Sequence, residues 1–134
     1  MYDRLDPRAV KRVSGPAWQD SRHLFGSLHS ALVGVSPTTG GSMTAAYVKY
    51  TDSGCRNPTR PYAVVWMKKA GLFVIGLALP PDFSPPFPSA QVPGHFYAGL
   101  TFYLVMGNEP IAPDGFSELA TLAHEFVRSR PPAA

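Results

Sequence analysis

Residues that break regular secondary structure are unusually frequent in this sequence, and they limit what the chain can fold into. Its 134 residues include 15 prolines and 12 glycines, about a fifth of the chain against roughly an eighth on average. Six of the prolines lie between Pro80 and Gly94, where the missing amide hydrogens prevent a strand from continuing. Regular elements must therefore be short or separated by long loops, which excludes a plain helix bundle.

The composition otherwise suits one folded domain. Hydrophobic residues make up 45% of the chain, an ordinary share for a globular protein, and the length fits a single domain. We predict an N-terminal arm at 1–13, one domain at 14–130 and a short tail at 131–134. The arm mixes acidic and basic side chains without an apolar core, unlike a signal peptide. The longest apolar run, at 72–79, is much shorter than the ~20 residues of a membrane-spanning helix, so we expect a cytoplasmic protein with no membrane partner.

Two helices are predicted at the ends of the domain. The first begins near Ser14 and ends at Gly34, because Ser-Gly-Pro is a helix-start pattern and glycine is a common helix end. Its apolar residues recur at helical spacing along one stripe. The second helix begins near Asp114 or Ser117. Its predicted apolar stripe comprises Leu119, Leu122, Ala123, Phe126 and Val127.

Four runs between these helices are typical of strands, at 44–50, 62–67, 72–79 and 95–106. The sequence KKAG at 68–71 predicts a hairpin turn between the second and third runs. This order of elements predicts an α+β fold. In it, a four-stranded, mostly antiparallel sheet carries both the N- and C-terminal helices on one face.

Alternation along the strands separates two faces of this sheet. One face is apolar and is predicted to pack against the helices; it comprises Ala46, Val48, Tyr50, Ala63, Val65, Met67, Phe73, Ile75, Leu77, Leu79, Phe96, Ala98, Leu100, Phe102 and Leu104. The other, which we call the aromatic face, combines rings, bases and small residues. Its candidate ligand- or partner-binding residues are Tyr47, Lys49, Tyr62, Trp66, Lys68, His95, Tyr97 and Tyr103. Rings with a polar group are enriched where a surface is half buried against something else.

Three functional hypotheses follow for the aromatic face. The first is a non-enzymatic binding or accessory domain with an unknown ligand or protein partner, a second copy in a homodimer included, and with the proline-rich loop at 80–94 partly covering the face. The second is a small enzyme with a pocket between face and loop and His95 as acid–base. The third is single-stranded nucleic-acid binding by the basic hairpin, because rings stack on bases while Lys and Arg meet phosphates. The sequence favours the first, because His95 has no acidic residue beside it on this face. A further alternative is that the loop packs on the face as a second small core.

Charge is distributed unevenly along the chain. Residues 44–69 have a formal net charge of +4, whereas residues 70–127 have −5 and contain no Lys or Arg. Such asymmetry orients a partner or drives head-to-tail self-association. The acidic second half argues against a uniformly basic nucleic-acid-binding protein, in which bases would be spread along the phosphate track.

The sequence lacks the G-x-S-x-G motif of hydrolases, the G-x-x-x-x-G-K phosphate loop and the G-x-G-x-x-G dinucleotide motif. His124-Glu125 begins like the zinc motif H-E-x-x-H, but residue 128 is arginine, so the second ligand is missing. Cys55 lies beside Arg56 with no base or oxyanion hole indicated nearby, and it is interpreted as a surface thiol whose reactivity stays open. We therefore predict no catalytic residue, no bound metal and no cofactor.

The run at 62–69, YAVVWMKK, resembles the second strand of the DUF5655 type of small bacterial domain, where F-A-x-V-x-P-x-K is typical; Trp66-Met67 stands where a proline is often found. The sequence LATLAHE at 119–125 is similar to the final helix motif L-x-x-L-x-x-A-Y, with His124 in place of the usual aromatic residue. The likeness covers roughly residues 20–128. It implies a small bacterial domain that occurs alone or appended to other proteins. The family has no assigned activity, so the resemblance implies a binding or accessory role and transfers no catalytic residue.

Overall fold

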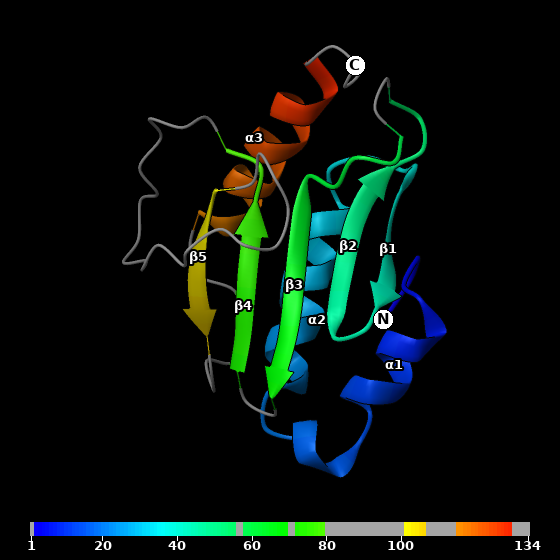
Figure 1. The fold of residues 1–134 in the computed structure, drawn as a ribbon, viewed down its shortest axis with the longest axis vertical. Helices are drawn as coiled ribbons and strands as arrows, with labels where there is room; N and C mark the ends of the chain where they lie inside the picture. The colour runs from blue at the N-terminus through cyan, green and yellow to red at the C-terminus, as the bar shows by residue number, and fades with distance from the viewer. Residues whose placement is uncertain (1, 56–57, 70–71, 80–100, 107–114, 130–134) are drawn as a thin grey trace.

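The structure is a computed structural model, and it describes residues 2–55, 58–69, 72–79, 101–106 and 115–129. One sheet with the long helices on one side forms the described part of the chain (Figure 1). The helices are α1 (Pro7–Val13), α2 (Arg22–Val33) and α3 (Phe116–Ser129), with a short 3-10 helix, η1 (Pro16–Trp18), before α2. The strands are β1 (Thr39–Thr44), β2 (Tyr47–Asp52), β3 (Ala63–Lys69), β4 (Leu72–Leu77) and β5 (Thr101–Met106).

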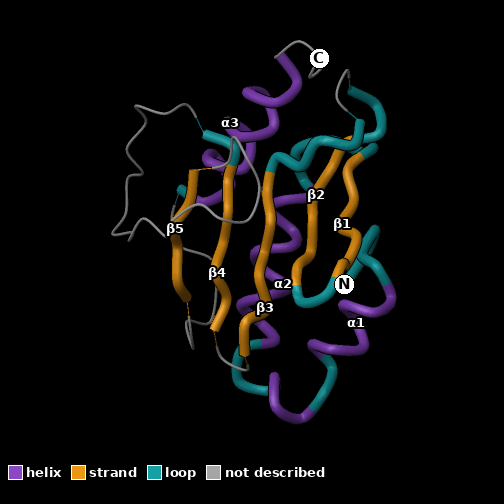
Figure 2. Tube along the Cα trace, viewed as in Figure 1, coloured by secondary structure: helices purple, strands orange, loops and turns teal. Residues whose placement is uncertain are grey.

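The predicted α+β class, with an antiparallel sheet and two long helices on one face, is confirmed. The described strands lie in the order β1-β2-β3-β4-β5, and each pairs antiparallel with the next. Helices α2 and α3 pack against one another and against the same side of this sheet, as the purple helices behind the orange strands show (Figure 2). The four predicted strand runs correspond to β2, β3, β4 and β5.

Strand β1 is an addition to the predicted sheet, since nearly all of it precedes the first predicted run at 44–50. It pairs with β2 along its whole length, from Thr39 opposite Asp52 to Thr44 opposite Tyr47. Gly41 is required there, because a Cβ atom at this position would lie 2.9 Å from Cγ1 of Val48. A strand with two adjacent glycines has no alternation of side chains, and its sequence therefore resembles a loop.

The predicted arm at 1–13 folds onto the sheet instead of extending from it. Helix α1 begins after Asp6, whose carboxylate accepts the backbone N–H of Arg8 at 2.9 Å. Ala9 and Val13 of α1 are fully buried, and the guanidinium of Arg4 donates to the backbone carbonyls of 33, 36 and 39. The N-terminal segment is thus part of the domain.

The first predicted helix is divided in two. Residues 16–18 form η1, and α2 begins only at Arg22, whose guanidinium donates to the carbonyls of Val13, Ser14 and Gly15. These carbonyls lie where the chain turns from α1 into η1, so Arg22 satisfies groups that a continuous helix would have used. Helix α2 ends at Val33 with Gly34 as its C-cap, in agreement with the predicted helix end.

The predicted apolar face forms the core. Its described members in β2, β3 and β4 and just beyond are buried: Val48, Tyr50, Ala63, Val65, Met67, Phe73, Ile75, Leu77 and Leu79. They pack with Leu24, Phe25, Leu28 and Leu32 of α2 and with Leu119, Ala120, Ala123 and Val127 of α3. Ala46 is half-buried in the turn between β1 and β2. Phe96, Ala98 and Leu100, like the proline-rich loop, lie outside the described residues, and only the backbone of Phe102 and Leu104 is described.

Candidate functional site

A stacked ring pair lies on the aromatic face, formed by Tyr47 of β2 and Trp66 of β3. The antiparallel register places these two residues directly opposite one another. Their ring centroids are 5.4 Å apart with the planes 18° from parallel, and both side chains are half-buried. Lys49 follows two positions along β2, opposite Val64, and is also half-buried. Alternation therefore brings these three predicted residues to one side of the sheet, opposite Val48 and the helices.

Tyr62 was predicted on the aromatic face, and this prediction is wrong. Its side chain is 1% exposed and lies on the helix side. Its hydroxyl donates to the backbone carbonyl of Leu32 at 2.5 Å, and its ring meets His124 edge-on, with centroids 5.3 Å apart. Tyr62 precedes the first residue of β3, where strand alternation no longer dictates the side-chain direction. Leu32 lies in the last turn of α2, where the backbone carbonyls lack partners within the helix. The Tyr62 hydroxyl provides a donor for one of these carbonyls.

The other predicted site residues are described only in part. Lys68 and Tyr103 belong to β3 and β5, of which only the backbone is described at these positions. His95 and Tyr97 lie outside the described residues, and the enzyme hypothesis based on His95 lies there with them. The middle of the aromatic face is not exposed to solvent, since Val64 and Val74 are only 2% and 5% exposed. The half-buried pair Tyr47–Trp66 therefore lies at one end of the face.

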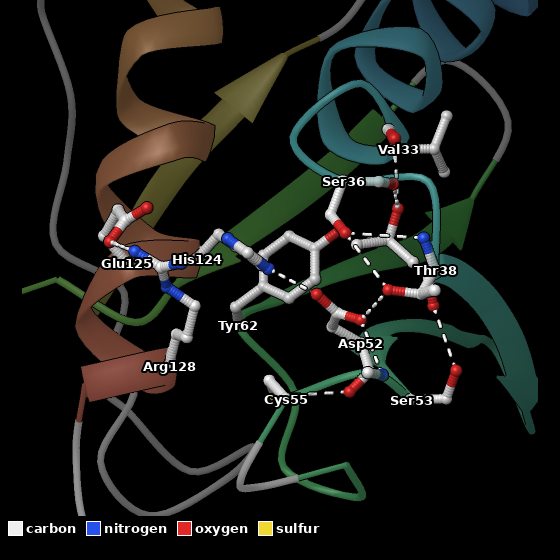
Figure 3. A network of polar contacts seen from close by, with 12 residues as sticks. Val33, Ser36, Thr38, Asp52, Ser53, Cys55, Tyr62, His124, Glu125 and Arg128 are labelled. Carbon is white, nitrogen blue, oxygen red and sulfur yellow. Dashed lines mark hydrogen bonds and ion pairs between the residues drawn. The ribbon is translucent and has the colours of Figure 1, made fainter.

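A second polar site, which the sequence did not indicate, joins Asp52 to His124 (Figure 3). Asp52 is the last residue of β2, and His124 lies in the middle of α3. Nε2 of His124 lies 2.7 Å from Oδ2 of Asp52, and the two side chains are only 8% and 5% exposed. Oδ1 of Asp52 accepts the hydroxyl of Thr38 and the backbone N–H of Gly54. Both carboxylate oxygens are therefore occupied.

These contacts determine the ionisation of Asp52. Burial raises the pKa of its carboxyl, but the hydrogen bonds from Thr38, His124 and the Gly54 backbone together outweigh burial and lower the pKa to about 2. The carboxylate is therefore charged at neutral pH and held by donors from three segments of the chain. Such a group anchors α3 to the end of β2 and to the turn before β1.

Catalysis by this pair is not supported by the surrounding groups. The thiol of Cys55 donates to the backbone carbonyl of Asp52 at 3.2 Å and not to the imidazole. Cys55 is half-buried, as expected for a thiol near the surface. Within the described ranges, no Cys–His pair of the kind used in nucleophilic catalysis is formed. We assign Asp52 and His124 a structural role.

The pKa of Asp52 gives a pH dependence with a definite sign. An unperturbed Asp has a pKa of about 3.9. A carboxyl whose pKa is lowered by folding contributes stability above that value, and this stability is lost as pH falls through the folded-state pKa. The thermal midpoint of the wild type should therefore fall relative to that of Asp52→Asn between pH about 4 and pH about 2. The comparison cancels the other carboxyls, Asp6 included; a constant difference over this range would contradict the assignment.

Gly54 is expected to be required beside Asp52. A Cβ atom there would lie 2.7 Å from Oγ1 of Thr38 and 3.3 Å from Oδ1 of Asp52. Gly54→Ala should lower the free energy of unfolding by about 1–3 kcal/mol, as overpacking does, measured by urea denaturation. Gly26→Ala is the matched control. Gly26 lies within α2, and the added Cβ would meet only the ring of Tyr2, at an ordinary contact distance of 3.9 Å. This substitution should stabilise the helix. Equal effects of the two substitutions would refute the prediction.

A second buried histidine holds the N-terminal segment. Nδ1 of His29 lies 2.9 Å from the hydroxyl of Tyr50, and Nε2 lies 2.7 Å from the carbonyl of Asp3. The hydroxyl donates to Nδ1 while Nε2–H donates to the carbonyl, which is the arrangement of a neutral ring. Burial lowers the pKa of His29, consistent with this neutral form. His29 is thus a satisfied core residue.

The described residues contain neither a metal-binding cluster nor a membrane-spanning helix. Among them, no three His, Cys, Asp or Glu side chains gather in a way that could hold a metal ion. None of the described helices combines the length and apolar character needed to cross a bilayer.

Comparisons with protein-family models, with curated proteins and with solved structures found no match to this chain. The resemblance of residues 62–69 and 119–125 to the DUF5655 type therefore stays a prediction.

Proposed function

We propose that this chain is a binding or accessory domain whose contact surface is the end of the aromatic face that carries Tyr47 and Trp66. One observation supports this most strongly: the two rings stack and are half-buried on the side of the sheet opposite α2 and α3. Core aromatic residues of this protein, such as Phe25 of α2 and Phe73 of β4, are fully buried in the core. Large rings held at an intermediate exposure are typical of contact surfaces.

The stacked geometry also favours binding energetically. A ring offers a large contact area with only two side-chain torsions to restrict. Stacking of Trp66 on Tyr47 restricts those torsions before any partner arrives, which lowers the entropy cost of association. The proposed partner is a ligand, another protein or a second copy of this chain, in agreement with what the DUF5655 resemblance implies.

Fluorine NMR of protein labelled with 5-fluorotryptophan tests this function. Trp18 and Trp66 are the two tryptophans of the chain, and Trp18 is buried at 6% exposure against Phe73. Trp66→Phe assigns the two resonances. The panel contains an oligothymidylate, ATP, an oligoglutamate, a proline-rich peptide and maltohexaose, and a concentration series of the protein alone tests self-association.

At least one of these probes, or concentration itself, should shift the Trp66 resonance while the Trp18 resonance stays in place. The proposal fails if every probe and every concentration leaves the Trp66 resonance unchanged. It also fails if both resonances always move together, since that would indicate a change in the whole fold.

A further inference from the structure

We propose that the partner of the aromatic face is a single-stranded nucleic acid, an inference that rests on the proposed function and specifies its ligand. The structure places cationic groups of α1 beside the backbone of β3, which carries Trp66, and beside the backbone of β1, which pairs with the strand that carries Tyr47. The guanidinium of Arg12 donates to the carbonyl of Met67 at 3.2 Å, and that of Arg8 donates to the carbonyl of Met43 at 2.6 Å.

These two contacts lie next to the rings in the sheet register. Met67 directly follows Trp66 along β3, and Met43 directly precedes Thr44, which pairs with Tyr47. The N–H of Met67 also donates to the carbonyl of Ala46 at 2.8 Å, and this bond joins β3 to the turn between β1 and β2. Helix α1 therefore lies at the end of the sheet where the ring pair is found (Figure 1).

Much of the positive charge at this end is not neutralised. Arg12 lies 5.8 Å from the ring centroid of Trp18 and bonds a carbonyl, and Arg22 likewise bonds carbonyls. Neither forms an ion pair among the described residues, and Lys11, which directly precedes Arg12 in α1, is exposed. Arg8 is paired with Asp6. Lys68 and Lys69 follow Met67 directly in β3, so the basic positions converge on one end of the sheet.

The acidic residues of the same part of the chain do not offset this charge. Residues 2–55 and 58–69 contain Asp3, Asp6, Asp20 and Asp52 as their acidic residues. Asp6 pairs with Arg8, and Asp52 is buried against His124 at the end of β2 remote from Tyr47. Asp3 and Asp20 are exposed, and they are outnumbered by the basic residues of this part of the chain, which include Lys11, Arg12 and Arg22.

The combination of rings and cations selects among anionic partners. An acidic peptide would satisfy the cations but offers no flat face to the rings, whereas a duplex hides its base faces inside the helix. A single strand presents phosphates and unstacked bases together, and stacking on protein rings is tolerant of base identity. The adjacent ring pair and basic helix therefore fit a single strand best.

The test is fluorescence anisotropy of a labelled oligothymidylate with the whole chain at several salt concentrations. Binding should weaken with salt, with a slope of about −0.7 per phosphate neutralised on a single strand. Lys11→Gln should make this slope shallower. Arg128→Gln removes the same charge from the last turn of α3, where Arg128 is exposed, and should leave the slope unchanged.

Trp66→Ala should weaken binding at least about 30-fold, within the range for the loss of one stacked base, without changing the salt slope. The duplex of the same sequence and an oligoglutamate should compete poorly. Equal competition by the duplex or by oligoglutamate would overturn the proposal, as would equal slopes for Lys11→Gln and Arg128→Gln. Absence of oligothymidylate binding, with the Trp66 resonance still shifted by another probe, would overturn this inference while leaving the proposed function standing.

Discussion

Replacing His124 by alanine is expected to lower the free energy of unfolding by about 3–5 kcal/mol, because it leaves a buried carboxylate without its side-chain partner. The substitution leaves the carboxylate of Asp52 at 5% side-chain exposure with Oδ2 unpaired. It also removes the ring that Tyr62 contacts edge-on. A small domain has only about 5–15 kcal/mol of stability, so a large share of it is at stake.

Urea denaturation of the wild type and four variants measures this effect. His23→Ala is the control, because His23 is exposed in the first turn of α2 and its loss should change stability by less than about 0.5 kcal/mol. Asp52→Ala and the double variant complete a mutant cycle, in which the double loss should be smaller than the sum of the single losses. A cost below about 1 kcal/mol for His124→Ala would show that the pair does not anchor α3.

Ile75→Ala is expected to cost about 2–5 kcal/mol, the range for truncating a fully buried aliphatic residue. Ile75 is 1% exposed in β4, between β3 and β5, on the face that packs against the helices. Removal of its side-chain carbons loses transfer free energy and leaves a cavity that paired strands on both sides cannot close. The midpoint and slope of urea unfolding give the loss.

Ile75→Val grades the same site, because it removes a single methylene group and should cost about 0.5–1.5 kcal/mol. Ile75→Ala should therefore cost more than Ile75→Val. The slope of urea unfolding should be the same for both variants, because an unchanged slope indicates unaltered compactness. A loss under about 1 kcal/mol for Ile75→Ala would mean that this face of β4 is not the core.

The sequence predicted the sheet well where strands alternate regularly. Inside β2 and β3 the period of two holds, and Tyr47, Lys49 and Trp66 lie on one side while Val48 and Val65 lie on the other. Alternation ends where the strand ends. Tyr62 lies one position before β3, and its side chain follows a hydrogen-bond acceptor on α2 that no local pattern reveals.

The site at Asp52 and His124 was missed for two reasons. The apolar stripe of the last helix was predicted at Leu119, Leu122, Ala123, Phe126 and Val127. Leu119, Ala123 and Val127 are buried as predicted, whereas Leu122 and Phe126 are only half-buried. Phe116, Ala120 and His124 are buried as well. Spacings of three, four and seven residues join Ala120, Ala123, His124 and Val127, so this signal was available once a histidine is allowed in the stripe. Asp52 lies 72 residues away, and only the tertiary fold brings it there.

Strand β1 and helix α1 were also not predicted from local patterns. A strand that contains Gly40 and Gly41 carries no alternating signal, and it is stabilised by pairing with β2. Helix α1 is seven residues long, too short to be stable alone, and is held by Asp6 and by the burial of Ala9 and Val13. Both elements depend on contacts with distant parts of the chain.

The most direct measurement of the proposed contact surface is the dissociation constant of Trp66→Ala for the probe that shifts the Trp66 resonance most. Phe126→Ala is the matched control, since Phe126 is a half-buried ring on α3, on the other side of the sheet. With both variants melting cooperatively, Trp66→Ala should bind at least about 30-fold more weakly, the loss of a contact-surface anchor, and Phe126→Ala should bind like the wild type. Equal affinity of Trp66→Ala and wild type would contradict the proposal and make the ring pair a packing feature of the sheet.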